Sequence, residues 1–125
     1  MKPSENCSVS CSNILVMEYS STMFATQGIR LSMSDKGQEI GHAFLYLIKN
    51  DEHDACAGFM EDVFVAETSR GKGVGTELVQ LVIAEAKKRG CYKLLATSRY
   101  TRPEVHAWYT KFGFIDYGKE FRMDL

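Results

Sequence analysis

The stretch RGKGVGTEL, residues 70–78, places three glycines directly before an apolar sequence that favours a helix. The first N–H groups of a helix have no partner within the helix and carry partial positive charge. Glycines at this point remove the side chains that would keep a phosphate away from those groups. With Arg70 and Lys72 beside the glycines, the stretch predicts a pyrophosphate cradle. The plainer alternative is a tight, solvated turn between a strand and a helix.

The flanking sequence predicts a strand before the cradle and a helix after it. CAGFMEDVFV, residues 56–65, is apolar apart from two adjacent carboxylates. Residues 76–90 carry an apolar stripe at helical spacing, wide enough to be covered on more than one side, and end in cations and a glycine. YKLLATS, residues 92–98, predicts a parallel strand reached by a right-handed crossover. The loop at 66–75 then lies at the carboxyl end of a strand, where open α/β sheets bind ligands.

The rest of the chain predicts more strands and one more helix. Strands are expected at residues 14–19, 28–34 and 39–49, a second helix begins at Pro103, and a terminal hairpin spans 114–125. The order predicts a mixed α/β fold, intermediate between α/β and α+β, with a mostly antiparallel sheet and helices packed on it. We expect a single domain over residues 1–125, in which the Ser/Cys-rich residues 1–13 form a mobile tail.

Composition excludes several classes of function. The chain of 125 residues has 15 basic and 16 acidic side chains, so nothing marks a general binder of nucleic acid or of anionic membranes. No apolar run is long enough for a signal peptide or a membrane span, and we expect a cytoplasmic location with free thiols. A zinc site is not expected, because the four residues that could assemble one lack CxxC spacing: Cys7, Cys11, His53 and Cys56.

The glycine-rich stretch resembles the acyl-CoA loop of the GNAT family of N-acetyltransferases. In that family Arg or Gln, two residues, Gly, one residue, and Gly or Ala precede a helix, and Arg70, Gly73 and Gly75 match this spacing. The segments MEDVFV, LLATS and AWYTKFGF fall where the family has them, so the resemblance covers about residues 57–125. It implies a GNAT-like fold and acetyl-CoA as cofactor. The residues implied in binding acetyl-CoA are Val63, Phe64, Val65, Arg70, Gly71, Lys72, Gly73, Val74, Gly75 and Thr76.

Within the family, the pattern is similar to that of glucosamine 6-phosphate N-acetyltransferases. Those enzymes carry a Glu-Asp pair before the loop, a GCYK-like segment, and a Tyr shortly before a Gly-Phe turn. Here the pair is Glu61 and Asp62, GCYK stands at residues 90–93, and Tyr109 precedes Gly113.

Acetyl transfer to an amine requires a base for the amine and an acid for the leaving thiolate. Glu61 or Asp62 can take the amine proton directly or through water, and because side chains alternate along a strand only one of them is expected to face the site. Tyr109 is the candidate acid, since a phenol and a thiol have comparable pKa values. The alternative for the two carboxylates is a salt bridge or a solvated strand edge. The alternative for Tyr109 is packing as a core aromatic. His106 is a second candidate for the base.

Two features depart from the family pattern. Pro103 and Glu104 stand where many members have an Asn before the Tyr, and only about 28 residues precede the strand at 28–34, so at most a short helix fits there. The acceptor side should then be open, or completed by a second copy in a homodimer. The predicted function is acetyl-CoA-dependent N-acetyltransfer to a primary amine, by direct transfer in a ternary complex. The alternative is a non-catalytic acyl-CoA-binding module with a sensing or assembly role.

Overall fold

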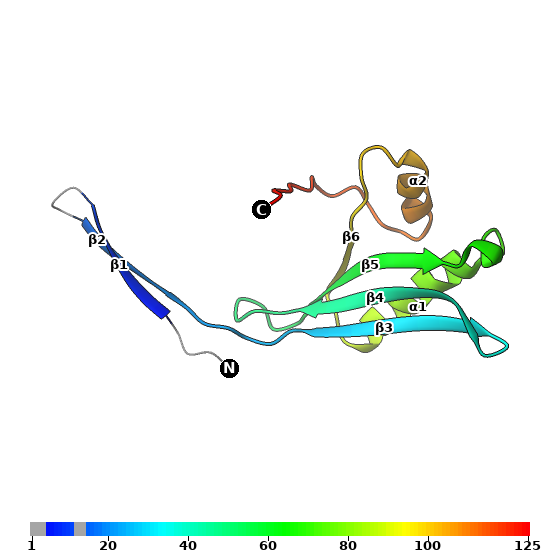
Figure 1. The fold of residues 1–125 in the computed structure, drawn as a ribbon, viewed down its shortest axis with the longest axis horizontal. Coiled ribbons are helices and arrows are strands. Elements are labelled where there is room, and N and C mark those ends of the chain that lie inside the picture. Colours follow the sequence, from blue (N-terminus) through cyan, green and yellow to red (C-terminus); the bar gives the residue numbers. More distant parts are fainter. Residues whose placement is uncertain (1–4, 12–14) are drawn as a thin grey trace.

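The computed structural model describes residues 5–11 and 15–125 of the chain (Figure 1). Its elements, in chain order, are β1 (Glu5–Cys11), β2 (Leu15–Ser21), β3 (Gln27–Asp35), β4 (Gln38–Ile48), β5 (Ala57–Val65), a 3-10 turn (Glu67–Ser69), α1 (Val74–Lys88), β6 (Lys93–Ala96) and α2 (Pro103–Lys111).

The main sheet has four strands in the order β3-β4-β5-β6. The β3–β4 and β4–β5 pairs are antiparallel, and β5 pairs in parallel with β6 over only four residues, from Ala57 with Lys93 to Met60 with Ala96. Helix α1 connects the two parallel strands, as a crossover between them requires. The predicted mixed fold, with its mostly antiparallel sheet, is therefore confirmed.

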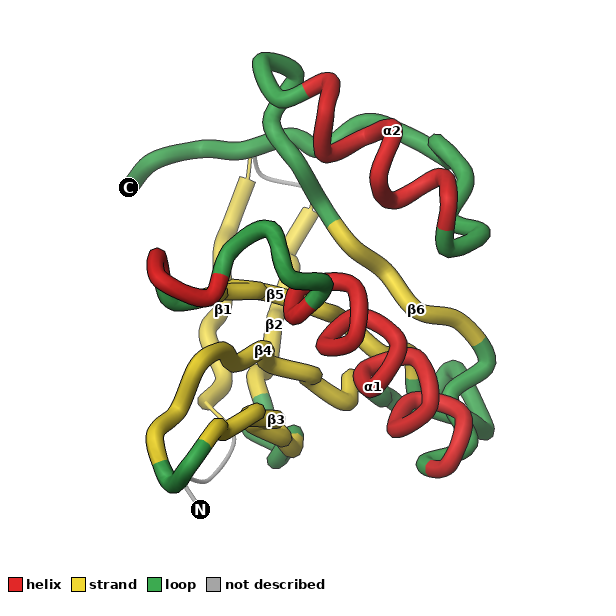
Figure 2. The backbone as a smooth tube through the Cα atoms, turned by 90° about the vertical axis from the view of Figure 1, so that its right-hand side faces the viewer, coloured by secondary structure: helices red, strands yellow, loops and turns green. Residues whose placement is uncertain are grey.

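Helix α1 packs along one face of the sheet (Figure 2). Its fully buried side chains Leu78, Val79 and Val82 recur at helical spacing. Val79 and Val82 cluster with Leu45 and Met60 from the central strands. The expectation that this helix is covered on more than one side is wrong, because Leu81 and Ala84 are exposed. Burial of a single stripe is enough to fix the helix on the sheet and thereby to fix where the helix begins.

Gly41 in β4 allows the first turns of α1 to approach the sheet closely. A Cβ at this position would lie 2.8 Å from Leu78 Cδ1, 2.9 Å from the carbonyl oxygen of Phe64 and 3.2 Å from Val74 Cγ1. The carbonyl belongs to the backbone of a central strand and cannot move away without disturbing the sheet. Gly41 therefore positions the amino end of α1, and with it the glycine-rich loop.

We expect Gly41→Ala to lower the free energy of unfolding by about 1–3 kcal/mol, because a methyl group is forced into a filled space. Urea-induced unfolding of the two proteins measures the difference. Gly118→Ala is the matched control, since no heavy atom lies within 4 Å of the added Cβ. Equal midpoints for Gly41→Ala and Gly118→Ala would contradict the close packing of α1 against β4.

The strands β5 and β6 separate beyond their four paired residues (Figure 1). β5 continues to Val65 and leads into the glycine-rich loop, whereas β6 ends at Ala96 and the chain turns away toward α2. Helix α2 contributes Trp108, Tyr109 and Phe112 to the rim of the core. One edge of the second half of β5 is thus left without a strand partner among the described residues.

The two ends of the chain differ from the predictions. Residues 5–11 were expected in a mobile tail, but they form β1 and pair with β2 as a separate hairpin, from Glu5 with Ser21 to Cys11 with Leu15. The strand predicted at 14–19 is present as β2, although residue 14, like 1–4 and 12–13, lies outside the described residues. No helix occurs between β2 and β3.

The predicted terminal hairpin at 114–125 is wrong. These residues form no strand, and five of their large apolar side chains are at least 78% exposed: Ile115, Tyr117, Phe121, Met123 and Leu125. Apolar and polar residues do alternate in this segment, but a strand forms only where another backbone pairs with it, and no strand edge meets this segment in the described part of the chain.

None of the described helices is long and apolar enough to cross a membrane.

Candidate functional site

The site is built around the amino end of α1. Gly73 takes the left-handed conformation, with φ of 84°, and is the residue that precedes the helix; no side chain caps this end. The first backbone hydrogen bond of the helix runs from the Glu77 N–H to the Gly73 carbonyl, at 3.0 Å. The N–H groups of the three residues before Glu77 are therefore free of helical partners, as a helix start requires.

A concave pocket of about 270 Å³ opens at this helix start. Its lining combines the loop, the end of β5 and one side chain from α2: Val65, Ser69, Arg70, Gly71, Gly73, Val74, Gly75, Thr76 and Trp108. Nothing lies within 4 Å of a Cβ built on Gly71 or Gly73, so side chains there would project into open space. The loop therefore presents bare backbone beside unpaired N–H groups, an arrangement suited to an anion.

Trp108 forms the far wall of this pocket and is held by α1. Its indole N–H donates to the Thr76 hydroxyl at 3.4 Å, and its ring lies 3.5 Å from the position that a Cβ on Gly75 would take. Phe112 meets the ring edge-on, with centroids 5.2 Å apart. Trp108, a residue far along the chain, therefore packs against the start of α1 and completes the lining of the pocket.

Arg70 is anchored to the end of β5. Its Nε donates to the Val65 carbonyl at 3.0 Å, and its guanidinium lies 6.0 Å from the centroid of the Phe64 ring. This bond ties the loop to the end of β5. Lys72 is exposed and does not line the pocket, so its positive charge lies beside the pocket rather than in its lining.

The backbone of Val65 faces the gap that β6 leaves. The N–H of Ala66 bonds to the Ile40 carbonyl of β4 at 2.8 Å, and strand geometry turns the groups of the neighbouring residue to the opposite side. There the Val65 carbonyl meets Arg70, while its N–H points into the gap. An extended ligand can form backbone hydrogen bonds with this edge of β5. The Val65 carbonyl is a less available acceptor there, because Arg70 already donates to it.

Glu61 and Asp62 lie at a β-bulge in β5. His42 of β4 pairs with Phe64 of β5, but two residues further along β4, Phe44 pairs with Glu61, so β5 has one extra residue between the two pairs. Asp62 lies in this bulge and has a positive φ of 52°. An aspartate tolerates this conformation better than a bulky residue does. Both carboxylates are exposed. The simple alternation assumed from the sequence does not hold here, because the bulge breaks it.

Tyr109 is half-buried on the core side of α2. Its ring contacts Trp108 and Phe114, with centroids 5.7 and 5.4 Å away. Burial raises the pKa of Tyr109 above 10.0, and the positive charge of Arg102 offsets part of this rise. The phenol is therefore held in its protonated form well above neutral pH. It lies beside Trp108 but outside the lining of the pocket itself.

The loop before α2 is ordered by side-chain contacts. His106 Nε2 lies 2.8 Å from the Arg99 carbonyl, to which it donates, so this nitrogen carries a proton and is not available as a base. Arg102 Nε donates to Glu104 at 2.6 Å, and this hydrogen bond is the main reason that the pKa of Glu104 is lowered. These contacts make His106 a structural residue of the loop.

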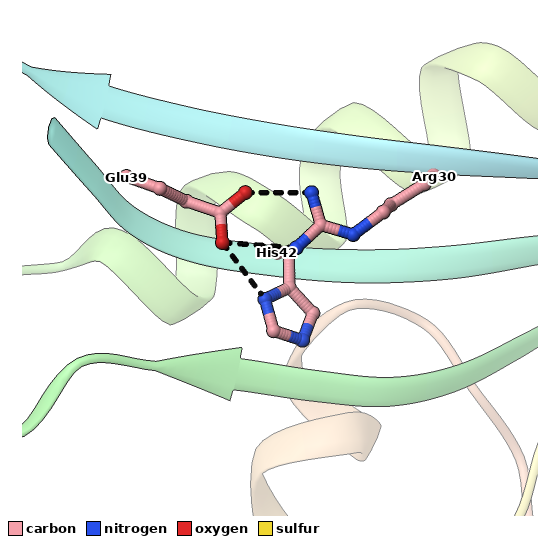
Figure 3. A network of polar contacts seen from close by, with 3 residues as sticks. All are labelled: Arg30, Glu39 and His42. Carbon is pink, nitrogen blue, oxygen red and sulfur yellow. Dashed lines mark hydrogen bonds and ion pairs between the residues drawn. The ribbon is translucent and has the colours of Figure 1, made fainter. Parts of the chain in front are cut away.

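The face of the sheet opposite α1 carries a polar network (Figure 3). Arg30 of β3 donates to both oxygens of Glu39, at 2.6 and 2.9 Å, and His42 Nδ1 lies 3.3 Å from the same carboxylate. The hydrogen bond from Arg30 is the largest cause of a lowered pKa at Glu39. The His42 ring stacks on Phe64, with centroids 5.2 Å apart, so this face is linked to the end of β5.

Sequence reasoning missed two residues of the pocket, Ser69 and Trp108. Trp108 was identifiable only as one of several aromatics on an amphipathic helix. The predicted residues Val63 and Phe64 do not line the pocket, and Glu61 and Asp62 lie before it on β5. No group of three or more metal-binding side chains is found in the described residues, and the side chains of Cys7 and Cys11 lie outside that description.

Curated glucosamine 6-phosphate N-acetyltransferases are similar to this chain in sequence. It is 39% identical over 61 residues to probable glucosamine 6-phosphate N-acetyltransferase 2 of Oryza sativa subsp. japonica, covering 49% of this chain and 35% of the rice protein. It is 32% identical over 91 residues to glucosamine 6-phosphate N-acetyltransferase of Trypanosoma brucei brucei, covering 71% of this chain and 59% of that protein. The chain thus spans about a third of the rice protein and under two thirds of the trypanosomal one.

Solved structures share the fold. A putative acetyltransferase from Agrobacterium tumefaciens str. C58 matches with a TM-score of 0.69 and 28% identity, over 75% of this chain and 66% of that one. An acetyltransferase of Trypanosoma brucei matches with a TM-score of 0.70 and 26% identity, over 78% and 69%. The model of the acetyltransferase (GNAT) family matches residues 12–114, and the chain therefore belongs to the GNAT acetyltransferase family.

Proposed function

We propose that this protein is an acetyl-CoA-dependent N-acetyltransferase that moves an acetyl group directly to a primary amine in a ternary complex. The observation that carries the proposal is the pocket at the start of α1, where unpaired N–H groups and bare glycine backbone adjoin the open edge of β5. A pyrophosphate suits the first feature and an extended pantetheine arm suits the second. The residues present therefore fit CoA.

The chain's own groups supply the proton transfers. Bound acetyl-CoA provides an acetyl group activated as a thioester. Glu61 or Asp62, both exposed on the bulge of β5, accepts the proton of the incoming ammonium directly or through water. Tyr109, whose phenol is protonated at neutral pH, donates its hydroxyl proton to the departing thiolate.

The acceptor is an amine that reaches the open side of the sheet. The relatives' names make glucosamine 6-phosphate the first acceptor to test. No helix covers the sheet face opposite α1 in the described part of the chain, and this openness favours a large, exposed acceptor or a homodimer that closes the site.

Calorimetric titration with acetyl-CoA, followed by an assay of thiol release with a panel of primary amines, tests the proposal. Micromolar binding together with amine-dependent thiol release supports the enzyme. Binding without thiol release for any amine supports the second candidate, an acyl-CoA-binding module. The position of Tyr109 outside the pocket lining favours this candidate. Absence of binding would overturn both.

Trp108 offers a direct report on the pocket, because it is the only tryptophan in the chain and forms one wall. We expect saturating acetyl-CoA to change the intensity of Trp108 emission, since a bound ligand displaces water from the half-buried indole. Fluorescence titration should return the dissociation constant found by calorimetry. Calorimetric saturation with unchanged emission would place the ligand away from this pocket.

A further inference from the structure

Two thiols lie in contact at the end of β5 that is remote from the cradle. Cys56 immediately precedes β5, Cys91 lies between α1 and β6, and their Sγ atoms are 3.4 Å apart. Both are half-buried and reduced. We propose that this pair is a modification site, at which a low-molecular-weight disulfide converts Cys56 and Cys91 into an intramolecular disulfide.

The backbone holds the two residues at a suitable separation. The N–H of Tyr92 donates to the Cys56 carbonyl at 3.1 Å, and the parallel pairing of β5 with β6 begins one residue later, at Ala57 with Lys93. Neighbouring strands bring their Cα atoms within the range that disulfides span. The sulfur atoms need to approach by only about 1.4 Å to reach bonding distance, which side-chain rotation can supply.

Gly58 of β5 lies beside Cys91. A Cβ at this position would lie 3.1 Å from Leu94 Cδ1 and 3.4 Å from Cys91 Sγ. Cys91 Sγ thus lies close to the backbone of β5 at this position. On the other side, Cys56 Sγ lies 3.9 Å from the Arg89 carbonyl at the carboxyl end of that helix.

The two thiols differ in access and reactivity. Cys56 lines a second pocket, of about 550 Å³, together with Lys49, Asp54 and Arg89, so a small reagent can reach it. Lys49 and Arg89 are cationic, and Arg89 also forms an ion pair with Glu85 at 3.3 Å. The two cations favour an anionic reagent such as glutathione disulfide. Burial, with a further contribution from Cys56, raises the pKa of Cys91 to about 11. Cys56 is thus the attacking thiol and Cys91 the resolving one.

The reaction proceeds by two exchanges. Cys56 loses its proton and attacks one sulfur of glutathione disulfide, which forms a mixed disulfide and releases one glutathione that takes up the proton. Cys91 then attacks the Cys56 sulfur, gives up its own proton and displaces the second glutathione. Two electrons pass from the protein to the reagent, and one disulfide is exchanged for another.

The new bond would close a loop from Cys56 to Cys91 that contains β5, the glycine-rich loop and α1. Cross-linking restricts the unfolded chain, so we expect the oxidised protein to melt on the order of 5–10 °C higher, reversibly on reduction. The cradle lies at the opposite end of β5, and its shape depends on contacts that the thiols do not touch. Any affinity for acetyl-CoA should therefore change by less than about twofold.

The experiment treats the folded chain, carrying Cys7→Ser and Cys11→Ser, with glutathione disulfide at neutral pH, then blocks free thiols and maps peptides by mass spectrometry. The expected product joins the peptides that contain Cys56 and Cys91, with the loss of two hydrogens and no retained glutathione. A Cys91→Ser variant should stop at one glutathione on Cys56, and a Cys56→Ser variant should leave Cys91 unmodified.

Three results would overturn the proposal: no reaction, a glutathione that persists on Cys56 although Cys91 is present, or a cross-link that forms only in urea. Melting curves of both single variants establish that they are folded before treatment. Because the readout is a covalent bond, the outcome does not depend on whether the protein is an acetyltransferase.

Discussion

Tyr109→Phe is expected to lower the rate of acetyl transfer by about 10²-fold or more, while the affinity for acetyl-CoA stays within about twofold of the parent. The substitution removes only the hydroxyl, so the ring contacts with Trp108 and Phe114 are kept. Loss of the proton donor slows departure of the thiolate and leaves the pocket lining unchanged. Thiol release under saturating substrates gives the rate, and calorimetry gives the affinity.

Tyr117→Phe is the matched control for this prediction, because Tyr117 is 91% exposed on the C-terminal segment and should tolerate the change. The pH profile adds a second check. Since burial raises the pKa of Tyr109, loss of its proton should reduce the rate only above pH 10, and Tyr109→Phe should lack that decline. Undiminished turnover in Tyr109→Phe would show that another group is the acid.

Gly73→Glu is expected to weaken acetyl-CoA binding by at least about 10²-fold, which corresponds to losing roughly two hydrogen bonds to a charged group. The new carboxylate would project from the residue that precedes α1 into the pocket, where it fills the cradle and repels a phosphate. Calorimetric titration and Trp108 emission both measure the loss. Circular dichroism establishes that the variant is folded.

Backbone strain must be separated from blockage of the cradle. Gly73 has φ of 84°, a conformation in which any side chain costs on the order of 1 kcal/mol. Gly90→Glu is the control, because Gly90 has φ of 75°, its Cβ would also meet open space, and it follows the opposite end of α1. Comparable loss of binding in both variants would mean that Gly73 acts through stability rather than as part of the cradle.

The spacing of apolar residues within short windows of sequence predicted the central elements of the fold. The alternation in β3 and β4, the apolar stripe of α1 and the glycines before it are each visible within a short window. Pattern failed at the two ends of the chain, where pairing decides the outcome. Ser/Cys-rich residues became β1 because β2 lies against them, whereas residues 114–125 met no strand edge and formed no strand.

The sequence alone determined the mixed fold, the family and the place of the glycine-rich loop before α1. Glycine conformation and a helix start are properties of adjacent residues, so RGKGVG carried that information within itself. Only the tertiary structure brought Trp108 to Gly75, bonded Arg70 to Val65 and placed Cys56 against Cys91. The physical reason is that packing and pairing join residues far apart along the chain, and no spacing in the sequence records which of them will meet.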